Sequence, residues 1–184
     1  MRCMNMHVAE NGGQGDLDRR QGIYLLIDSL GDTNEHEGRM RAAQALGESR
    51  DPRAISPLIV CLKDVDPRLR RCCAEALLKL GSIRSVGAFI GCLEDREESL
   101  FTRKVAADAL AKIRSYSAIE SLVGRLLDPG ENESIRVHAA DALGRTGSLR
   151  AIDALEKCIE DPNPQVRYES GKALSQIFAF GPGR

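Results

Sequence analysis

The sequence is poor in aromatic residues and contains no tryptophan. Aromatic residues make up 4% of the 184 residues, whereas 42% of the chain is hydrophobic. Runs rich in Val, Thr and aromatic residues with a period of two, which are typical of strands, are absent. The apolar residues are mainly Ala, Leu and Ile at helical spacing, and small residues let helices approach one another closely. The composition therefore predicts an all-α protein.

The chain also lacks an excess of charge and a long apolar run. Its net charge is -1 with 29% charged residues, so the chain as a whole does not attract nucleic acid or an anionic membrane. No apolar run approaches the roughly 18 residues that a transmembrane helix needs. Residues 1–15 lack the apolar stretch of a secretory signal and are interpreted as a flexible N-terminal tail. We expect a cytoplasmic protein with neither a membrane nor a nucleic-acid partner.

The six cysteines do not have the spacing of a metal site. None forms a C-x-x-C pair. Cys61, Cys92 and Cys158 fall near the ends of apolar helical stripes, where a thiol packs as a small hydrophobic group. Cys72 and Cys73 are adjacent on an expected helix and point in different directions. We interpret the cysteines as reduced thiols of the core, with a metal or disulfide role as the alternative. No metal or cofactor is expected.

What the sequence has in abundance is internal repetition. Residues 136–144 read Arg-Val-His-Ala-Ala-Asp-Ala-Leu-Gly, and related stretches begin at Arg39, Arg70, Arg103 and Arg167. Successive leading arginines are 31, 33, 33 and 31 residues apart. Self-similarity at a period of 20–50 residues is typical of stacked repeat proteins.

Each of these stretches follows an apolar helical stripe and an aspartate. One such stripe, at positions i, i+3, i+4 and i+7 of a single helix face, consists of Ile119, Leu122, Val123 and Leu126. Neither helix of a pair can bury its apolar face alone, but a stack of pairs forms one core. We therefore predict a single domain, 16–180, of five helix pairs in repeats 16–48, 49–80, 81–114, 115–147 and 148–180, followed by a C-terminal tail, 181–184.

The expected helix boundaries have chemical causes. Asp51, Asp66 and Asn163 each precede a proline, and an N-capping side chain followed by Pro at the first helical position favours a helix start. Gly81 and Gly147 suit the left-handed residue that ends a helix.

One aspartate and one arginine recur in every repeat. The carboxylate precedes the inner helix, and the arginine lies in its first turns. A guanidinium can hydrogen-bond both the carboxylate of its own repeat and that of the neighbouring one. We interpret these residues as a structural ladder along the stack rather than as metal or acid–base chemistry; they are Asp32, Arg39, Asp64, Arg70, Asp95, Arg103, Asp128, Arg136, Asp161 and Arg167.

The order of outer helix, Asp, turn and then Val/Ile-Arg-x-x-Ala-Ala-x-Ala-Leu-Gly resembles the HEAT repeat, and more narrowly the HEAT-like repeats of the phycobilisome-lyase type. The resemblance covers residue 17 to about residue 180, with local departures at Cys72-Cys73 and Ser170-Gly171. It implies a right-handed, armadillo-like α-solenoid whose inner helices line a concave face. It also implies a scaffold for contacts between proteins, since most members of the family act in that way.

Variable positions between the core residues of each inner helix are expected to point out of the concave face. Interfaces favour aromatic, Met and Arg side chains as anchors. The expected partner-binding residues are Met40, Arg41, Arg71, Lys104, His138, Asp141, Arg145 and Tyr168. The alternative for each is an ordinary solvated helix surface. We expect the partner to be another protein or a peptide, and the end repeats could also join copies into a homo-oligomer.

An enzymatic role is not expected from the residues alone. The chain has three histidines and no G-x-S-x-G, P-loop or G-x-G-x-x-G motif. His138 and Asp141 share one helix, where a surface hydrogen bond explains them. A family of HEAT-repeat hydroxylases holds two irons with repeated His-Glu pairs, and this chain has one such pair, at His36.

We therefore predict a non-catalytic interaction scaffold or adaptor that binds its partner on the concave face. The alternative is a subunit of a bilin lyase or of a chaperone-like enzyme complex. In that case Cys72, Arg145 and Tyr168 would be the residues closest in character to a chromophore site.

Overall fold

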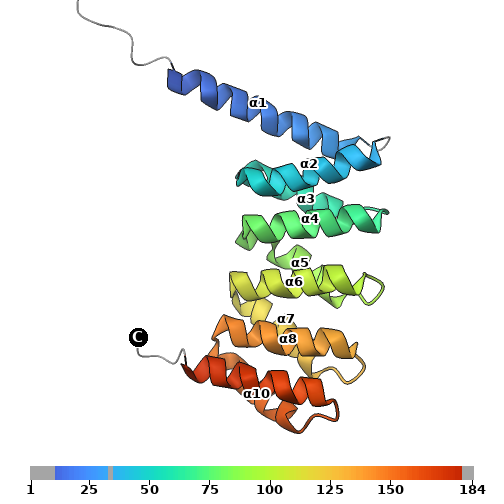
Figure 1. Ribbon diagram of the computed structural model, residues 1–184, viewed down its shortest axis with the longest axis vertical. Helices are drawn as coiled ribbons and strands as arrows, with labels where there is room; N and C mark the ends of the chain where they lie inside the picture. Colours follow the sequence, from blue (N-terminus) through green and yellow to red (C-terminus); the bar gives the residue numbers. More distant parts are fainter. Residues whose placement is uncertain (1–10, 33–34, 180–184) are drawn as a thin grey trace, which may run out of the picture.

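The computed structural model describes residues 11–32 and 35–179, and these form a stack of helices without a strand (Figure 1). Consecutive helices pair as an outer and an inner helix. The five pairs are α1 (Asn11–Gly31) with α2 (His36–Ser49), α3 (Ile55–Cys61) with α4 (Pro67–Leu80), α5 (Val86–Glu94) with α6 (Leu100–Ile113), α7 (Tyr116–Leu127) with α8 (Glu133–Thr146), and α9 (Ile152–Lys157) with α10 (Pro164–Ala179). The predicted all-α solenoid of five pairs is confirmed.

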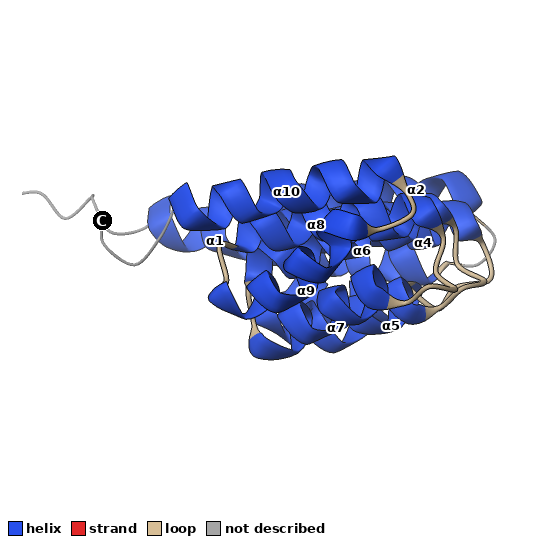
Figure 2. Ribbon diagram, turned by 90° about the horizontal axis from the view of Figure 1, so that it is seen from below, coloured by secondary structure: helices blue, strands red, loops and turns tan. Residues whose placement is uncertain are grey.

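The helices lie in two layers. Figure 2 shows α2, α4, α6, α8 and α10 in one layer and α5, α7 and α9 in the other. Each inner helix packs against its own outer helix and against the inner helices before and after it. Contacts between neighbouring repeats therefore carry the stability of the whole stack.

The core runs through the stack as one continuous cluster of alanines and leucines. Ala106, Ala139 and Ala140 of the inner helices have no exposed surface, and neither have Leu110 and Leu143. Because alanine side chains are short, the inner helices come close together. The alanines and leucines that the sequence predicts as core residues therefore also form the contacts between consecutive repeats.

The helix starts have the capping contacts that the sequence predicts. The Asp66 carboxylate accepts from the backbone N–H of Arg68 at 2.9 Å, and the Asn163 side-chain oxygen accepts from that of Gln165 at 2.8 Å. The outer helices of the second, third and fifth repeats begin with a 3-10 turn, at 52–54, 83–85 and 149–151.

The helix ends include two residues that the sequence did not indicate. Gly81 and Gly147 end α4 and α8 with φ values of 61° and 65°, as expected. Arg50 and Arg114 have the same left-handed conformation at the ends of α2 and α6, with φ values of 55° and 56°. Helices α2 and α6 therefore end on an arginine, where α4 and α8 end on a glycine.

The first helix starts earlier than the sequence suggested. Helix α1 begins at Asn11, inside the segment 1–15 that was expected to be a tail. Residues 1–10 and the C-terminal tail 181–184 lie outside the described residues. The boundary of the domain at its two ends stays a prediction. Across the described segments, none of the helices has the length and apolar character needed to cross a membrane.

Candidate functional site

The exposed face of the inner helices carries the residues expected to bind a partner. Tyr168 on α10 is 69% exposed, and Arg41 on α2 is also exposed. Met40 and Lys104 are half-buried at the corresponding position of α2 and α6. The exposed guanidinium of Arg41 lies 3.7 Å from Glu37 on its own helix.

An aromatic residue that the sequence analysis did not single out lies beside Arg71. The guanidinium of Arg71 is stacked over the ring of Phe101, 3.7 Å from its centre, and it donates to Glu75 at 3.1 Å. Phe101 is 42% exposed at the start of α6. Arg71 and Phe101 thus form a solvent-facing pair across two repeats. In the sequence, the position of this Phe just after the expected start of an inner helix could have marked it as a surface residue.

Three of the expected residues meet in one network on α6 and α8. The ring nitrogen Nε2 of His138 lies 3.1 Å from the carboxylate of Asp108, and the guanidinium of Arg145 forms an ion pair with the same carboxylate. Arg145 also donates to Asp141 at 3.0 Å. His138 therefore pairs with a carboxylate of the neighbouring repeat and not with Asp141 of its own helix.

The network continues to the last inner helix. Lys172 on α10 lies 3.3 Å from Asp141 and 2.8 Å from Glu169. Alternating charges thus connect the inner helices of three repeats. Because these side chains are partly exposed, each pair contributes little stability. The network mainly fixes the direction in which the side chains point.

Asp108 at the centre of the network is held in its charged form. Burial alone would raise the pKa of its carboxyl group. Hydrogen bonds from His138 and Arg145 outweigh burial and lower the pKa below the ordinary value of 3.8. Asp108 is therefore an anchor for these two side chains and not a proton donor near neutral pH.

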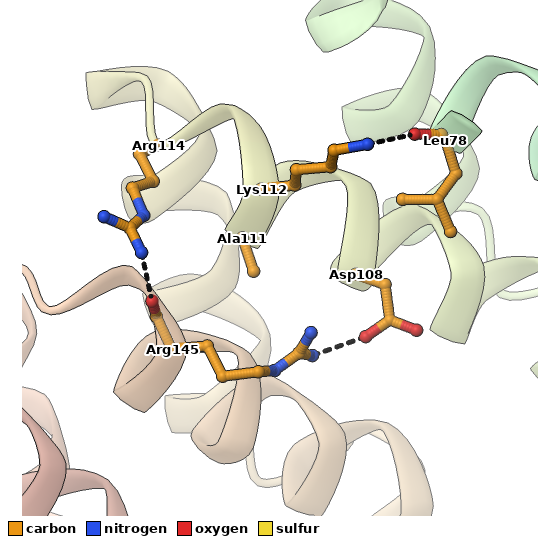
Figure 3. Close-up of a pocket in the computed structure, with 6 residues that line it drawn as sticks. All are labelled: Leu78, Asp108, Ala111, Lys112, Arg114 and Arg145. Carbon is orange, nitrogen blue, oxygen red and sulfur yellow. Dashed lines mark hydrogen bonds and ion pairs between the residues drawn. The ribbon is translucent and has the colours of Figure 1, made fainter. Parts of the chain in front are cut away.

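A shallow hollow of about 360 Å³ opens beside this network (Figure 3). Its lining combines cationic side chains with an apolar floor and consists of Leu78, Asp108, Ala111, Lys112, Arg114 and Arg145. Lys112 donates to the carbonyl oxygen of Leu78 at 3.0 Å, and Arg114 donates to that of Arg145 at 2.9 Å. The hollow therefore presents three cations against a single carboxylate.

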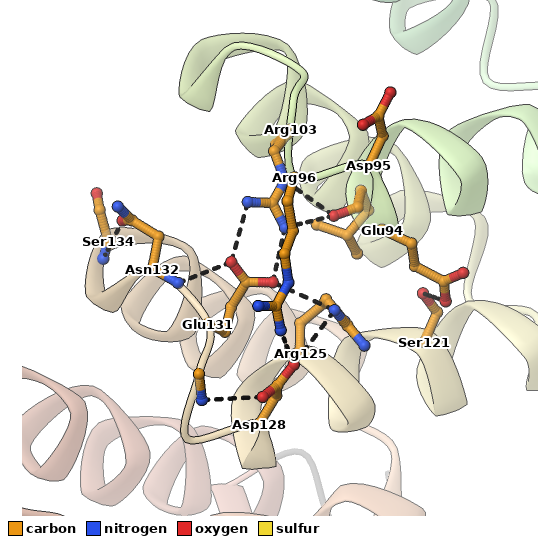
Figure 4. A network of polar contacts seen from close by, with 12 residues as sticks. Glu94, Asp95, Arg96, Arg103, Ser121, Arg125, Asp128, Glu131, Asn132 and Ser134 are labelled. Carbon is orange, nitrogen blue, oxygen red and sulfur yellow. Dashed lines mark hydrogen bonds and ion pairs between the residues drawn. The ribbon is translucent and has the colours of Figure 1, made fainter.

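The ladder arginines contact the outer helices and the links before the inner helices. Arg103 is 2% exposed and forms a bidentate pair with Glu131, with N–O distances of 2.9 and 2.7 Å (Figure 4). It also donates to the carbonyl oxygen of Leu93, the last turn of its own outer helix. Arg39 and Arg136 likewise donate to carbonyl oxygens in the last turn of their outer helices, whereas Arg70 donates to the link carbonyl of Asp64.

The carboxylate partners differ from the expected set in two repeats. Arg39 pairs with Asp64 at 2.6 Å and Arg136 pairs with Asp161. Arg70 pairs with Glu98 at 2.5 Å, and Arg103 with Glu131, so Asp95 and Asp128 are not ladder partners. Asp128 instead pairs with Arg96 at 2.7 Å (Figure 4), and the carboxylate of Asp95 accepts from the backbone of Glu97.

The physical reason is the spacing between the aspartate and the inner helix. Asp95 and Asp128 lie five residues before the first residue of α6 and α8, whereas Asp64 and Asp161 lie three residues before that of α4 and α10. In the two repeats with the larger spacing, the residue before the N-cap is a glutamate. Its additional methylene group reaches the same point in space. At the two ends of the ladder, Asp32 is the last described residue before 33–34, and Arg167 donates to the backbone carbonyl of Asp161 at 2.6 Å.

The described residues do not bring together a metal site or a catalytic triad. No group of three or more His, Cys, Asp or Glu that could hold a metal ion occurs within 11–32 and 35–179. The five cysteines in these ranges are free thiols, and all except Cys72 are buried. The face of the inner helices is suited to binding, with cations that can hold a carboxylate and aromatic rings that can contact an apolar group.

Comparison with known proteins gives a family and a curated relative. The family model of HEAT repeats matches residues 23–101 and 126–179. The phycocyanobilin lyase subunit alpha of Synechococcus elongatus is 33% identical over 94 residues, which is 48% of this chain. The chain covers 34% of that relative's length, about a third.

Solved structures share the fold. The complex of CpcE and CpcF of phycocyanin lyase from Nostoc sp. PCC7120 matches with a TM-score of 0.68 and 23% identity, covering 97% of this chain and 69% of that one. A designed armadillo repeat protein in complex with the peptide (KR)4 matches with a TM-score of 0.58 and 20% identity, covering 89% of this chain and 84% of that one.

The expectation that the chain is not an enzyme is wrong in light of its relatives. The matched curated protein is a subunit of a lyase, and the similar Nostoc structure is a complex of two lyase chains. A search of one chain for a complete catalytic set assumes that a single chain carries all the chemistry. Reactive and binding groups can instead be divided between two chains, so the lack of a triad in one of them excludes nothing.

Proposed function

This chain belongs to the HEAT-repeat family, and we propose that it is a subunit of a bilin lyase that holds a chromophore and a protein partner on the face of its inner helices. The observation that carries the proposal is the 33% identity to the phycocyanobilin lyase subunit alpha. The interaction role predicted from the repeats remains part of the proposal, as the function of one subunit within an enzyme complex.

The chemistry of the hollow between α6 and α8 supports a bilin as the ligand. A bilin is an open-chain tetrapyrrole with propionate side chains. Lys112, Arg114 and Arg145 offer cations for these carboxylates, and Leu78 and Ala111 offer an apolar floor for a pyrrole ring. Its volume of about 360 Å³ is at the lower end of the range for ligand pockets. The hollow would hold the propionate-bearing part of a bilin, and a partner chain would cover the rest.

The remaining part of the same face supports contact with a protein. Tyr168, Phe101 and Arg71 are exposed on it, and aromatic and Arg side chains are the usual anchors of protein interfaces. We propose that these residues, together with the sequence-predicted Met40, Arg41, Lys104, His138 and Asp141, contact the partner subunit or the protein that accepts the bilin.

The experiment is a titration of phycocyanobilin into the purified chain, alone and mixed with CpcF, followed by absorbance and by the circular dichroism that an ordered bilin acquires. We expect a shifted absorbance band and an induced dichroic signal with the wild type. The double variant Lys112→Ala/Arg145→Ala should weaken binding by about tenfold, because two charge-assisted contacts are lost. A matched control is Lys63→Ala/Lys157→Ala, which removes two exposed cations outside the hollow.

A spectrum that stays that of the free bilin, with the chain alone and with CpcF present, would contradict the proposal. Equal weakening by the two double variants would move the bilin away from the hollow between α6 and α8.

A further inference from the structure

The links along the two edges of the stack differ in their charged residues. The links from outer to inner helices lie along one edge, on the right in Figure 1, and the links from inner to outer helices lie along the other. The links 62–66, 95–99, 128–132 and 161–163 contain eight carboxylates and two cations. The links 50–54, 81–85, 114–115 and 147–151 contain five arginines and one carboxylate. Ladder arginines pair with four carboxylates of the first edge, whereas the arginines of the second edge outnumber its carboxylate by five to one.

The five arginines of the second edge, here called the arginine rim, are Arg50, Arg53, Arg84, Arg114 and Arg150. Arg53 forms a bidentate pair with Asp51, at 3.0 and 2.6 Å. The other four have no carboxylate in ion-pair contact among the described residues.

These four arginines use only neutral contacts, or none. Arg84 donates to the hydroxyl of Ser56 at 3.1 Å, and Arg150 is stacked over the ring of Tyr116 at 4.8 Å. Arg114 donates to a carbonyl oxygen. Arg50 makes no hydrogen bond, ion pair or ring contact with any residue that the structure describes. The positive charge of the rim is thus available to a partner.

At two of these positions the backbone has a left-handed conformation, which is unfavourable for residues other than glycine. Arg50 and Arg114 have φ values of 55° and 56°, a left-handed conformation that costs free energy for a residue with a side chain. Gly81 and Gly147 occupy the same place in the other repeats without that cost. A guanidinium kept at a position that suits glycine points to a role outside the stability of the fold.

Large apolar side chains stand between the arginines. Ile83, Tyr116 and Leu149 each follow an N-capping serine at the start of an outer helix, and they are 70%, 61% and 54% exposed. Apolar side chains next to arginines are typical of protein interfaces. The phosphate backbone of a nucleic acid needs cations but offers nothing to Ile or Leu. The rim is therefore better matched to a protein than to a nucleic acid.

We propose that the arginine rim is a docking surface for an acidic protein segment in which carboxylates alternate with apolar residues. The carboxylates of that segment accept from Arg50, Arg84 and Arg150, and its apolar side chains pack against Ile83 and Leu149. The charge of the partner follows from complementarity, since the rim has one carboxylate for five arginines. The surface is an edge of the stack and does not depend on the bilin lyase proposal.

The test uses a short fluorescein-labelled peptide of Glu and Leu, whose binding to the full chain is measured by fluorescence anisotropy at low salt. The wild type should bind it, and binding should weaken as salt is raised. Arg84→Glu/Arg150→Glu should weaken binding by about tenfold. This double variant should fold, because an acidic side chain near a helix N-terminus is favourable. Neither residue lines the hollow between α6 and α8, so bilin binding should be unchanged.

Controls separate the rim from general charge effects. Lys63→Glu/Lys157→Glu makes the same change in net charge away from the rim and should leave peptide binding within about twofold of the wild type. Arg50→Gly should weaken binding of the peptide without lowering the melting midpoint, since glycine suits this backbone.

Several results would overturn the proposal. These are an absence of peptide binding by the wild type, equal losses in the two charge-reversed variants, and equally tight binding of a peptide of Lys and Leu. Tighter binding of a single-stranded oligonucleotide would assign the rim to nucleic acid. Self-association at low salt that Arg84→Glu/Arg150→Glu abolishes would assign it to the acidic edge of a second copy.

Discussion

At the scale of single residues, the ladder requires a carboxylate at a fixed point in space and not at a fixed place in the sequence. Arg39 and Arg136 find an aspartate there, whereas Arg70 and Arg103 find a glutamate. The pair of Arg103 with Glu131 is the most deeply buried, with side chains 2% and 1% exposed. A buried charge of this kind is tolerated because a bidentate partner and a helix carbonyl satisfy it.

The substitution Glu131→Gln tests how much this pair contributes to the free energy of unfolding. We expect a loss of about 3–5 kcal/mol in the free energy of unfolding, because Arg103 is left buried without a full counter-charge. The comparison is Glu75→Gln, which removes the exposed partner of Arg71 and should cost about 0–1 kcal/mol. Urea unfolding followed by circular dichroism measures both. Similar losses in the two variants would show that the ladder is no stronger than a surface pair.

The same pair gives the stack a dependence on acid pH. Burial acts to raise the pKa of Glu131, but hydrogen bonds from Arg103 and Asn132 lower it below the ordinary value of 4.5. A lowered folded-state pKa stabilises the protein above the ordinary pKa, and this contribution is lost as the pH falls through the folded-state pKa. The difference in stability between wild type and Glu131→Gln should therefore be constant near neutral pH and shrink in acid.

At the scale of helices, two glycines set how closely the inner helices approach. A Cβ atom on Gly47 would lie 2.7 Å from the Cα of Ala76, and one on Gly144 would lie 2.8 Å from the Cα of Ala173. Real side chains do not approach a backbone so closely. The glycine that ends the repeated sequence Ala-x-Ala-Leu-Gly is thus a contact point between consecutive inner helices and not a helix stop.

The prediction at this scale compares two glycines of inner helices. Gly47→Ala should destabilise the chain by about 1–3 kcal/mol, because α2 and α4 must move apart. Gly171→Ala in α10 meets no atom within 4 Å and should stabilise by about 0.5–1 kcal/mol through helix propensity. Thermal unfolding of both variants gives the comparison. A neutral Gly47→Ala would mean that the stack adjusts at this contact.

At the scale of the whole molecule, each repeat packs against the repeats next to it in the stack. A middle repeat contacts a repeat on each side, whereas an end repeat contacts one. Stacking brings together side chains from positions about 30 residues apart in sequence, such as Ser56 and Arg84. A net charge of -1 gives no sign of the excess of arginine along one edge.

Hydrogen exchange tests this view of stability. Because each repeat depends on its neighbours, amides in α4, α6 and α8 should exchange most slowly, and those of α1 and α10 most rapidly. Native-state exchange measured by mass spectrometry on peptides from each helix would show the gradient. Uniform protection from α1 to α10 would instead indicate a single cooperative unit.

Much of the architecture could be predicted because it depends on local features. The alanine and leucine spacing, the caps at Asp66 and Asn163, and Gly81 as a helix end each leave a signature within a few residues. Glu131 as the partner of Arg103 could not be predicted, since the choice depends on how the link 128–132 folds. The hollow at Arg145 and the stacking of Arg71 on Phe101 join residues of different repeats and have no local signature.

The sequence by itself determined that this protein is a stack of five helix pairs, because periodic apolar positions and caps act over distances of one or two helical turns. The tertiary structure alone decided which carboxylates complete the ladder and which cations remain without one. It also placed Arg50, Arg84 and Arg150 on one edge and the links rich in carboxylates on the other. The physical reason is that ion pairs form between side chains close in space, and stacking makes neighbours of residues that the chain keeps apart.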